Sequence, residues 1–137
     1  MMRCGTYLLF MTFDHDMKID IGALGNVSFP AGEYCYIGSA MRGLDQRLGR
    51  HFSKEKTIHW HIDRLTVTAD HMEAYESYPE PILECQLVGM VETAAGEPVL
   101  NGFGCSDCDC RTHLFKMNED SKRSVISAAK LKPYKPR

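Results

Sequence analysis

The 137-residue sequence lacks any apolar run long enough to cross a bilayer, since a spanning helix needs about 20 such residues. Its first segment, MMRCGTYLLFMTF, also lacks the small-residue cleavage site of a signal peptide. The alternating pattern that follows indicates a strand instead. We therefore expect a cytoplasmic protein with no membrane association.

The chain also lacks an excess of positive charge. Its formal net charge is −2 at pH 7, which excludes the global basic field that drives non-specific nucleic-acid binding. A nucleic-acid role would need basic residues gathered on one face. The best local candidates are Arg42, Arg47, Arg50, Lys54 and Lys56, followed by the tail residues Lys130, Lys132, Lys135 and Arg137.

Internal repeats and linker-like segments are absent as well. The length and the 44% hydrophobic content suit one globular domain over residues 1–137. Strand and helix patterns alternate irregularly along it. We therefore expect an α+β fold with a small antiparallel sheet flanked by helices.

Local patterns predict the individual elements. Leu44, Leu48 and Phe52 form one helical stripe, so a helix over about 43–53 would point Arg47 and His51 the other way. Three successive strands near the N-terminus suggest an antiparallel meander. The expected strands are 4–13, 18–21, 27–29, 33–39, 66–75 and 112–117, and residues 60–65 form a short helix or strand. Further helices cover about 81–92, with Pro81 in the first turn, and about 118–130, with a loop over 94–104.

Two tyrosine motifs carry a family resemblance. GTY at 5–7 and YIG at 36–38 resemble the paired motifs of the GIY-YIG nuclease superfamily. Arg47 and His51 occupy the positions of that superfamily's helical arginine and histidine, and Glu84 that of its metal-binding glutamate. Over nearly its whole length, including HWHID and GFG-SDC-C-HLF, the chain is similar to the uncharacterised Uri-type, DUF123-like branch.

This resemblance implies a DNA endonuclease that uses Mg²⁺ or Mn²⁺. Tyr7 would activate water, Tyr36 would position solvent or phosphate, and His51 would accept a proton. Arg47 would clamp the phosphate, because a guanidinium pairs well with its oxygens, and its charge would favour phenolate at Tyr7. Glu84 would hold the ion. Further substrate-binding candidates are Gly38, Ser39, Arg50, His59 and His61.

The sequence departs from the family pattern at three points. Thr6 replaces isoleucine, and the long stretch between Tyr7 and Tyr36 predicts an extra strand or hairpin. The spacing to Arg47 is about one residue longer than in the shortest versions, which leaves Arg50 as the alternative. A lone catalytic domain is expected to take its specificity from a protein partner or a homodimer.

His59-Trp60-His61 supports two interpretations. In a strand the two histidines would share one face, near the phosphate or at a metal. Alternatively, Trp60 anchors the core between hydrogen-bonded histidines, and Asp63 orients one of them.

A cysteine cluster near the C-terminus suggests Zn²⁺. Cys105, Cys108, Cys110 and His113 provide four potential ligands, and a set of Cys108, Cys110 and His113 with one remote ligand is an alternative. The alternatives are a redox pair at Cys105 and Cys108, or reduced thiols in a turn packed by Phe103. By contrast, Cys35 and Cys85 lie among apolar residues and are expected to act as small hydrophobes.

Two other functions therefore stay open beside the nuclease. One is a non-catalytic nucleic-acid-binding module on the same fold, which the acidic net charge favours. The other is a zinc or thiol protein centred on Cys105–His113.

Overall fold

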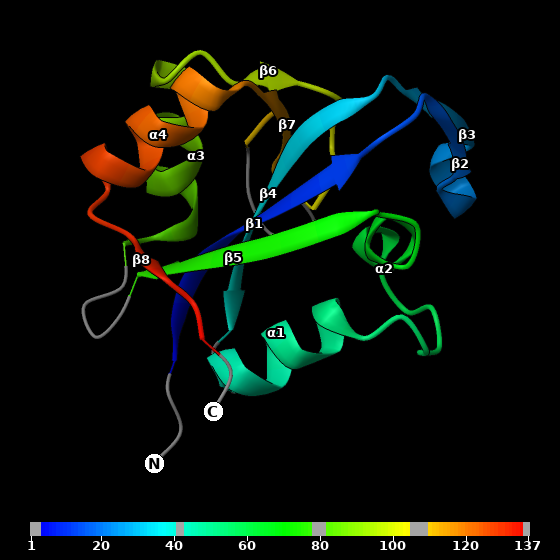
Figure 1. Cartoon of the computed structure of the whole chain (residues 1–137), viewed down its shortest axis with the longest axis horizontal. Helices are drawn as coiled ribbons and strands as arrows, with labels where there is room; N and C mark the ends of the chain where they lie inside the picture. The colour runs from blue at the N-terminus through cyan, green and yellow to red at the C-terminus, as the bar shows by residue number, and fades with distance from the viewer. Residues whose placement is uncertain (1–3, 41–42, 78–81, 105–109, 136–137) are drawn as a thin grey trace.

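The computed structural model describes residues 4–40, 43–77, 82–104 and 110–135. These form a six-stranded antiparallel sheet, in the order β6-β7-β4-β1-β5-β8, with helices on both faces (Figure 1). The predicted α+β class is confirmed. The elements are β1 (Gly5–Phe13), β2 (Met17–Asp20), a 3-10 turn (Gly22–Leu24), β3 (Asn26–Phe29), β4 (Gly32–Ala40), α1 (Leu44–Phe52), α2 (His61–Thr66), β5 (His71–Ser77), α3 (Glu84–Thr93), β6 (Glu97–Pro98), β7 (Leu114–Met117), α4 (Glu119–Ala128) and β8 (Lys132–Pro133).

Strand β1 is the centre of the sheet, because it pairs along its length with β4 on one side and β5 on the other. Its side chains alternate between two buried clusters. Tyr7, Leu9 and Met11 face the cluster under α1 and α2. Leu8 and Phe10 face the cluster under α3 and α4. Burial on both faces explains why this strand is continuously apolar.

The expected meander is wrong, because β1 pairs with β4 and not with the next strand. Strands β2 and β3 pair with each other in a separate ribbon. Three residues (14–16) lead from β1 into this ribbon and only two (30–31) lead back. The pairing of β2 with β3 is therefore shifted by one residue relative to the pairing of β1 with β4. The extra hairpin predicted between Tyr7 and Tyr36 is thereby confirmed.

The predicted strand over 66–75 is also wrong at its start. Thr66 ends helix α2, and the strand begins at His71. The loop predicted over 94–104 contains the short strand β6, and Pro133 lies in the edge strand β8. Two-residue edge strands carry too few side chains to produce a period-two pattern.

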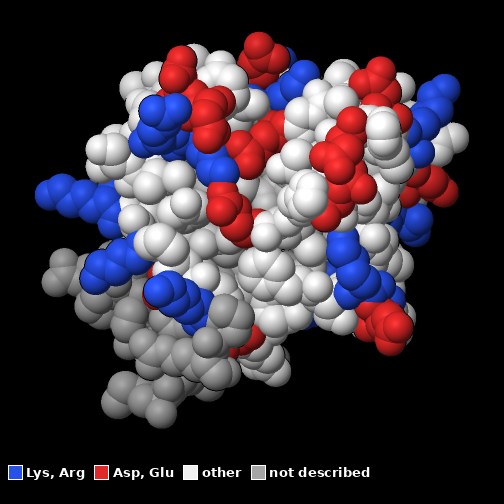
Figure 2. All heavy atoms as spheres, viewed as in Figure 1, with Lys and Arg blue, Asp and Glu red and all other residues white. Residues whose placement is uncertain are grey.

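Charges of both signs are interspersed on the face drawn in Figure 2, without a continuous basic surface. None of the helices in the described part of the chain has the length and apolar character needed to span a bilayer.

Candidate active site

The two motif tyrosines lie on neighbouring strands and on the same face of the sheet. Tyr7 is opposite Gly38 in the β1–β4 ladder, and Tyr36 is two residues before Gly38. A Cβ atom on Gly38 would lie 2.4 Å from the Tyr7 hydroxyl oxygen. Glycine is therefore required here so that the Tyr7 ring can cross the neighbouring strand.

Tyr7 and His51 form the central polar contact of the site. The Tyr7 hydroxyl lies 2.7 Å from His51 Nε2 in a buried environment. The Tyr36 ring lies within 6.5 Å of the Tyr7 ring and 6.0 Å of the His51 ring, between centroids. Strands β1 and β4 and helix α1 thus bring three predicted site residues together.

His51 points into the molecule, so the expectation that it faces away from the buried helix stripe is wrong. It is only 1% exposed and shares the buried face of α1 with Leu44 and Leu48. Burial, together with the charges of Lys56 and Arg47, lowers its pKa to about 3. The imidazole is therefore neutral at pH 7 and is a weaker base than an ordinary histidine.

The Tyr7 hydroxyl is a weaker acid than the sequence suggested. Burial, followed by the influence of Tyr36, raises its pKa above the ordinary value for tyrosine. Arg47 lowers this pKa but does not offset burial. Phenolate is thus not favoured at Tyr7, because desolvation outweighs the nearby cation.

Ser39 connects Arg47 with Glu84. Arg47 Nη1 donates to the Ser39 carbonyl oxygen over 3.3 Å. The Ser39 side chain hydrogen-bonds to Glu84, the first residue of α3. Arg47 on α1 and Glu84 on α3, on opposite faces of the sheet, thus both contact Ser39, and both influence the pKa of Tyr7.

Glu84 is held in its ionised form. Burial alone would raise its pKa, but hydrogen bonds to His113 and Ser39 and the charge of Arg47 lower it overall. His113 Nδ1 lies 3.2 Å from Glu84 Oε1. The Glu84 side chain keeps 29% of its surface exposed, so it is partly open to solvent.

Arg50 is bound to a different partner from Arg47. It donates to Asp63 Oδ2 over 2.7 Å, and Asp63 also accepts from the backbone N–H groups of His59 and Trp60. These bonds lower the pKa of Asp63 against the opposing effect of its burial. Of the two arginines, Arg47 therefore lies closer to Tyr7 and Glu84.

The HWHID segment is not a strand. His61 begins helix α2 and His59 precedes it, so the shared strand face predicted for the two histidines is wrong. Trp60 is 45% exposed, which also excludes its expected role as a core anchor. The Arg47 and Arg50 guanidinium carbons lie 4.8 and 5.0 Å from its ring centroid. Trp60 is thus an exposed aromatic surface beside the phosphate-clamp candidate.

His61 and His59 lie at the edge of this region. The His61 ring packs 6.1 Å from the Phe103 ring, which in turn lies 6.0 Å from Tyr36. The exposed His59 ring lies 6.4 Å from Trp60. His61 therefore lies against Phe103, which contacts Tyr36, whereas His59 lies against Trp60.

Part of the predicted cysteine site falls outside the described residues, namely Cys105 and Cys108. The structure brings the other two, Cys110 and His113, to Cys85, with all three potential ligand atoms within 4.8 Å of one another. The three form a possible metal-binding group. Cys35 is fully buried as expected, but Cys85 is exposed, so its expected role as a small hydrophobe is wrong.

The model of a family described as "Domain of unknown function DUF123" matches residues 6–133. The chain belongs to this family. No curated protein and no solved structure matches it. Membership in DUF123 assigns no activity, so the function must be argued from the site.

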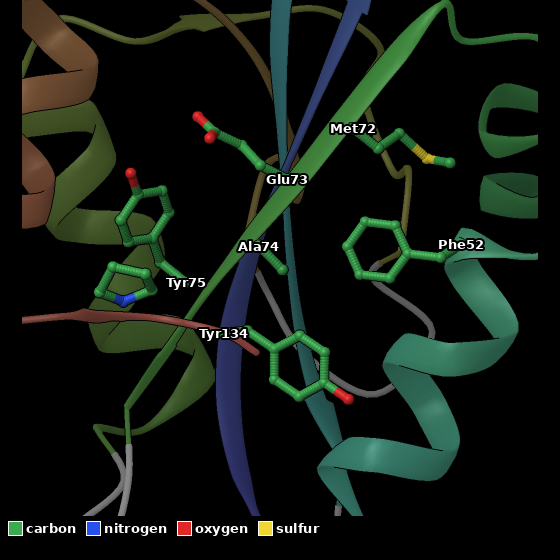
Figure 3. Close-up of a pocket in the computed structure, with 7 residues that line it drawn as sticks. Phe52, Met72, Glu73, Ala74, Tyr75 and Tyr134 are labelled. Carbon is green, nitrogen blue, oxygen red and sulfur yellow. The ribbon is translucent and has the colours of Figure 1, made fainter. Parts of the chain in front are cut away.

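A pocket of about 280 Å³ lies elsewhere on this DUF123 domain, along β5 and β8 (Figure 3). Tyr134 stacks on Phe52 there and donates to Asp45 on α1. Its lining does not include Tyr7, Tyr36, Arg47, His51 or Glu84. The lining residues are Phe52, Met72, Glu73, Ala74, Tyr75, Pro133 and Tyr134.

Sequence reasoning missed one residue of the DUF123 site region, Cys85, and one contact, that of His113 with Glu84. Cys85 gave no local signal, because its partners lie 25 residues or more away in the chain. His113 was expected at a metal, yet its contact with Glu84 was not foreseen. Only the folding of α3 against the segment before β7 reveals both contacts.

Proposed function

We propose that the protein is a metal-dependent endonuclease that hydrolyses phosphodiester bonds in DNA. The observation that carries this proposal is the buried Tyr7–His51 hydrogen bond, with Arg47 and Glu84 next to it. A core tyrosine has no packing need for a histidine partner and two nearby charged groups of opposite sign. This combination suits a reaction that moves a proton beside a phosphate.

The proton path begins at an attacking water. In the tautomer with its proton on Nδ1, His51 accepts the Tyr7 hydroxyl proton at Nε2 while the Tyr7 oxygen takes one from the water. The low pKa of His51 and the raised pKa of Tyr7 oppose this transfer in the free protein. A phosphate bound at Arg47 would offset only that residue's share of the lowered His51 pKa, because burial and Lys56 lower it more.

The phosphate would be bound by Arg47 and by a divalent cation. The ionised, partly exposed carboxylate of Glu84 fits Mg²⁺ or Mn²⁺, which prefer oxygen ligands and retain several waters. Such an ion, when bound, supplies positive charge to the phosphate and the leaving oxygen. Tyr36, partly exposed beside Tyr7, would position solvent or phosphate.

Substrate contacts would extend over the neighbouring surface. Gly38 and Ser39 lie between Tyr7 and Arg47, and Trp60 continues the surface toward His59. Base stacking on an exposed indole is tolerant of sequence. We therefore propose that a protein partner or a second copy supplies specificity, and that the protein acts in the cytoplasm.

A cleavage assay with Tyr7→Phe tests the proton path. Supercoiled, single-stranded and branched DNA are incubated with Mg²⁺ or Mn²⁺, and product formation is measured. We expect Tyr7→Phe to lower the rate at least about 100-fold, the usual scale of general acid–base catalysis.

Tyr34→Phe is the matched control, because this buried tyrosine donates to the Pro30 carbonyl away from the site. It should cleave within about threefold of wild type if folded. Equal cleavage by Tyr7→Phe and wild type would refute the proposed role of Tyr7.

A further inference from the structure

Three potential metal ligands meet on the α3–α4 side of the sheet, although they are distant in sequence. Cys85 lies in the first turn of α3, while Cys110 and His113 precede β7. The sulfur atoms of Cys85 and Cys110 are 3.0 Å apart, and the His113 ligand atom lies within 4.8 Å of both. A small shift of flexible thiol side chains would place all three around one ion.

The donor set selects a particular class of metal. Two thiolates and an imidazole suit zinc and related borderline or soft ions, whereas Mg²⁺ prefers oxygen ligands. Cys85 is exposed, so an ion can reach the group from solvent.

The carboxylate next to His113 is a second, independent indication. Metal-binding histidines usually donate their other ring N–H to a carboxylate, which fixes the tautomer and the ring orientation. His113 is almost fully buried, and its Nδ1 faces Glu84 Oε1 at 3.2 Å. With the proton on Nδ1, the lone pair of the neutral ring lies on Nε2, which is then the nitrogen that would bind the metal.

We propose that Cys85, Cys110 and His113 bind one Zn²⁺, with the fourth position taken by water or another donor. Binding releases the two thiol protons and forms two Zn–S bonds and one Zn–N bond. The ion ties the start of α3 to the segment before β7, and through His113 it fixes Glu84. The metal site does not depend on nuclease activity, because zinc content is its readout.

The test uses the full-length, reduced protein. Zinc is removed with a chelator, zinc alone is added back, and affinity is measured by competition with a chromophoric chelator. We expect wild type to bind zinc and Cys85→Ser to bind it at least tenfold more weakly. In wild type, Co²⁺ in place of Zn²⁺ should produce thiolate-to-cobalt charge-transfer absorption.

Cys4→Ser is the matched control, since Cys4 is only partly buried and precedes β1. It should bind zinc like wild type. Circular dichroism checks that Cys85→Ser is folded, and Cys110→Ser provides a second variant if it is not. Unchanged zinc affinity in folded Cys85→Ser, absence of zinc binding by wild type, or a Cys85–Cys110 disulfide in its place would overturn the proposal.

Discussion

Tyr7 can pack beside Tyr36 because residue 38 has no Cβ atom. The Tyr7 ring occupies the space above Gly38 where any other residue would place its Cβ. The glycine of the YIG motif is thus explained by packing. Its partner tyrosine in the GTY motif, Tyr7, is the residue that requires it.

Gly38→Ala should therefore destabilise the protein by about 1–3 kcal/mol, because the new methyl group overpacks a fully buried contact. Chemical denaturation measures the change. Gly89→Ala, in the interior of α3 with no atom near the added Cβ, should instead stabilise by about 0.5–1 kcal/mol. Similar effects of the two variants would contradict this packing.

His51 should make stability depend on pH. Its folded pKa of about 3 lies below its ordinary value of 6.5, since burial, Lys56, Arg47 and Arg50 all oppose the charged form and only Asp63 favours it. Between these values the unfolded chain binds more protons, so this stability is complete above about pH 7 and is lost as pH falls.

From pH 7 to pH 5, the free energy of unfolding should fall by about 1–2 kcal/mol less for His51→Gln than for wild type. His15→Gln, an exposed control, should follow wild type. Urea denaturation at several pH values measures both variants. Parallel pH profiles for wild type and His51→Gln would show that His51 is not buried in its neutral form.

At the scale of elements, the site depends on how α1 is joined to α2. Lys56 Nζ donates to the Arg50 and His51 carbonyls at the end of α1 and to Thr66 Oγ1 at the end of α2. Asp63 accepts from Arg50 and from the backbone before α2. The two helices are therefore held together by buried polar groups.

Asp63→Asn should cost about 2–4 kcal/mol, because Arg50 and Lys56 lose their shared counter-charge in a buried setting. The exposed Asp120→Asn in the first turn of α4 should cost less than about 1 kcal/mol. Thermal and urea denaturation provide the comparison. A cost below 1 kcal/mol for Asp63→Asn would mean that this junction is not a major source of stability.

Sequence patterns predicted the elements in which the spacing of apolar residues matches the face that the fold buries. The leucine stripe of α1 and the apolar β1 are examples, as is the Asn118 cap, whose side chain accepts from the Ser121 N–H. The patterns placed a short element over 60–65, where α2 lies, but did not decide between helix and strand. HWHID has no clear period, and the start of α2 depends on Asp63, three residues after Trp60.

The site residues that belong to short sequence motifs were predictable. The resemblance supplied Tyr7, Tyr36, Arg47 and Glu84, and the fold brings these together. Burial of His51 was not predictable, since it depends on where the Tyr7 hydroxyl lies after packing. Cys85 likewise becomes a potential ligand only through a contact between distant segments.

On the scale of the whole molecule, charge is not what would attract DNA. The net charge is −2, and the face in Figure 2 mixes both signs. Recognition would then depend on a few phosphate and stacking contacts around Arg47 and Trp60, with modest sensitivity to salt. A metal ion at Glu84 would supply much of the positive charge that the surface lacks.

Metal-dependent cleavage of supercoiled DNA tests the central proposal most directly. Wild type should nick the plasmid with Mg²⁺ or Mn²⁺ and not with a chelator. Glu84→Ala should lose at least about 100-fold in rate, while the exposed Glu92→Ala on the same helix should retain wild-type activity. DNA binding without nicking by wild type, or equal nicking by Glu84→Ala, would contradict the account.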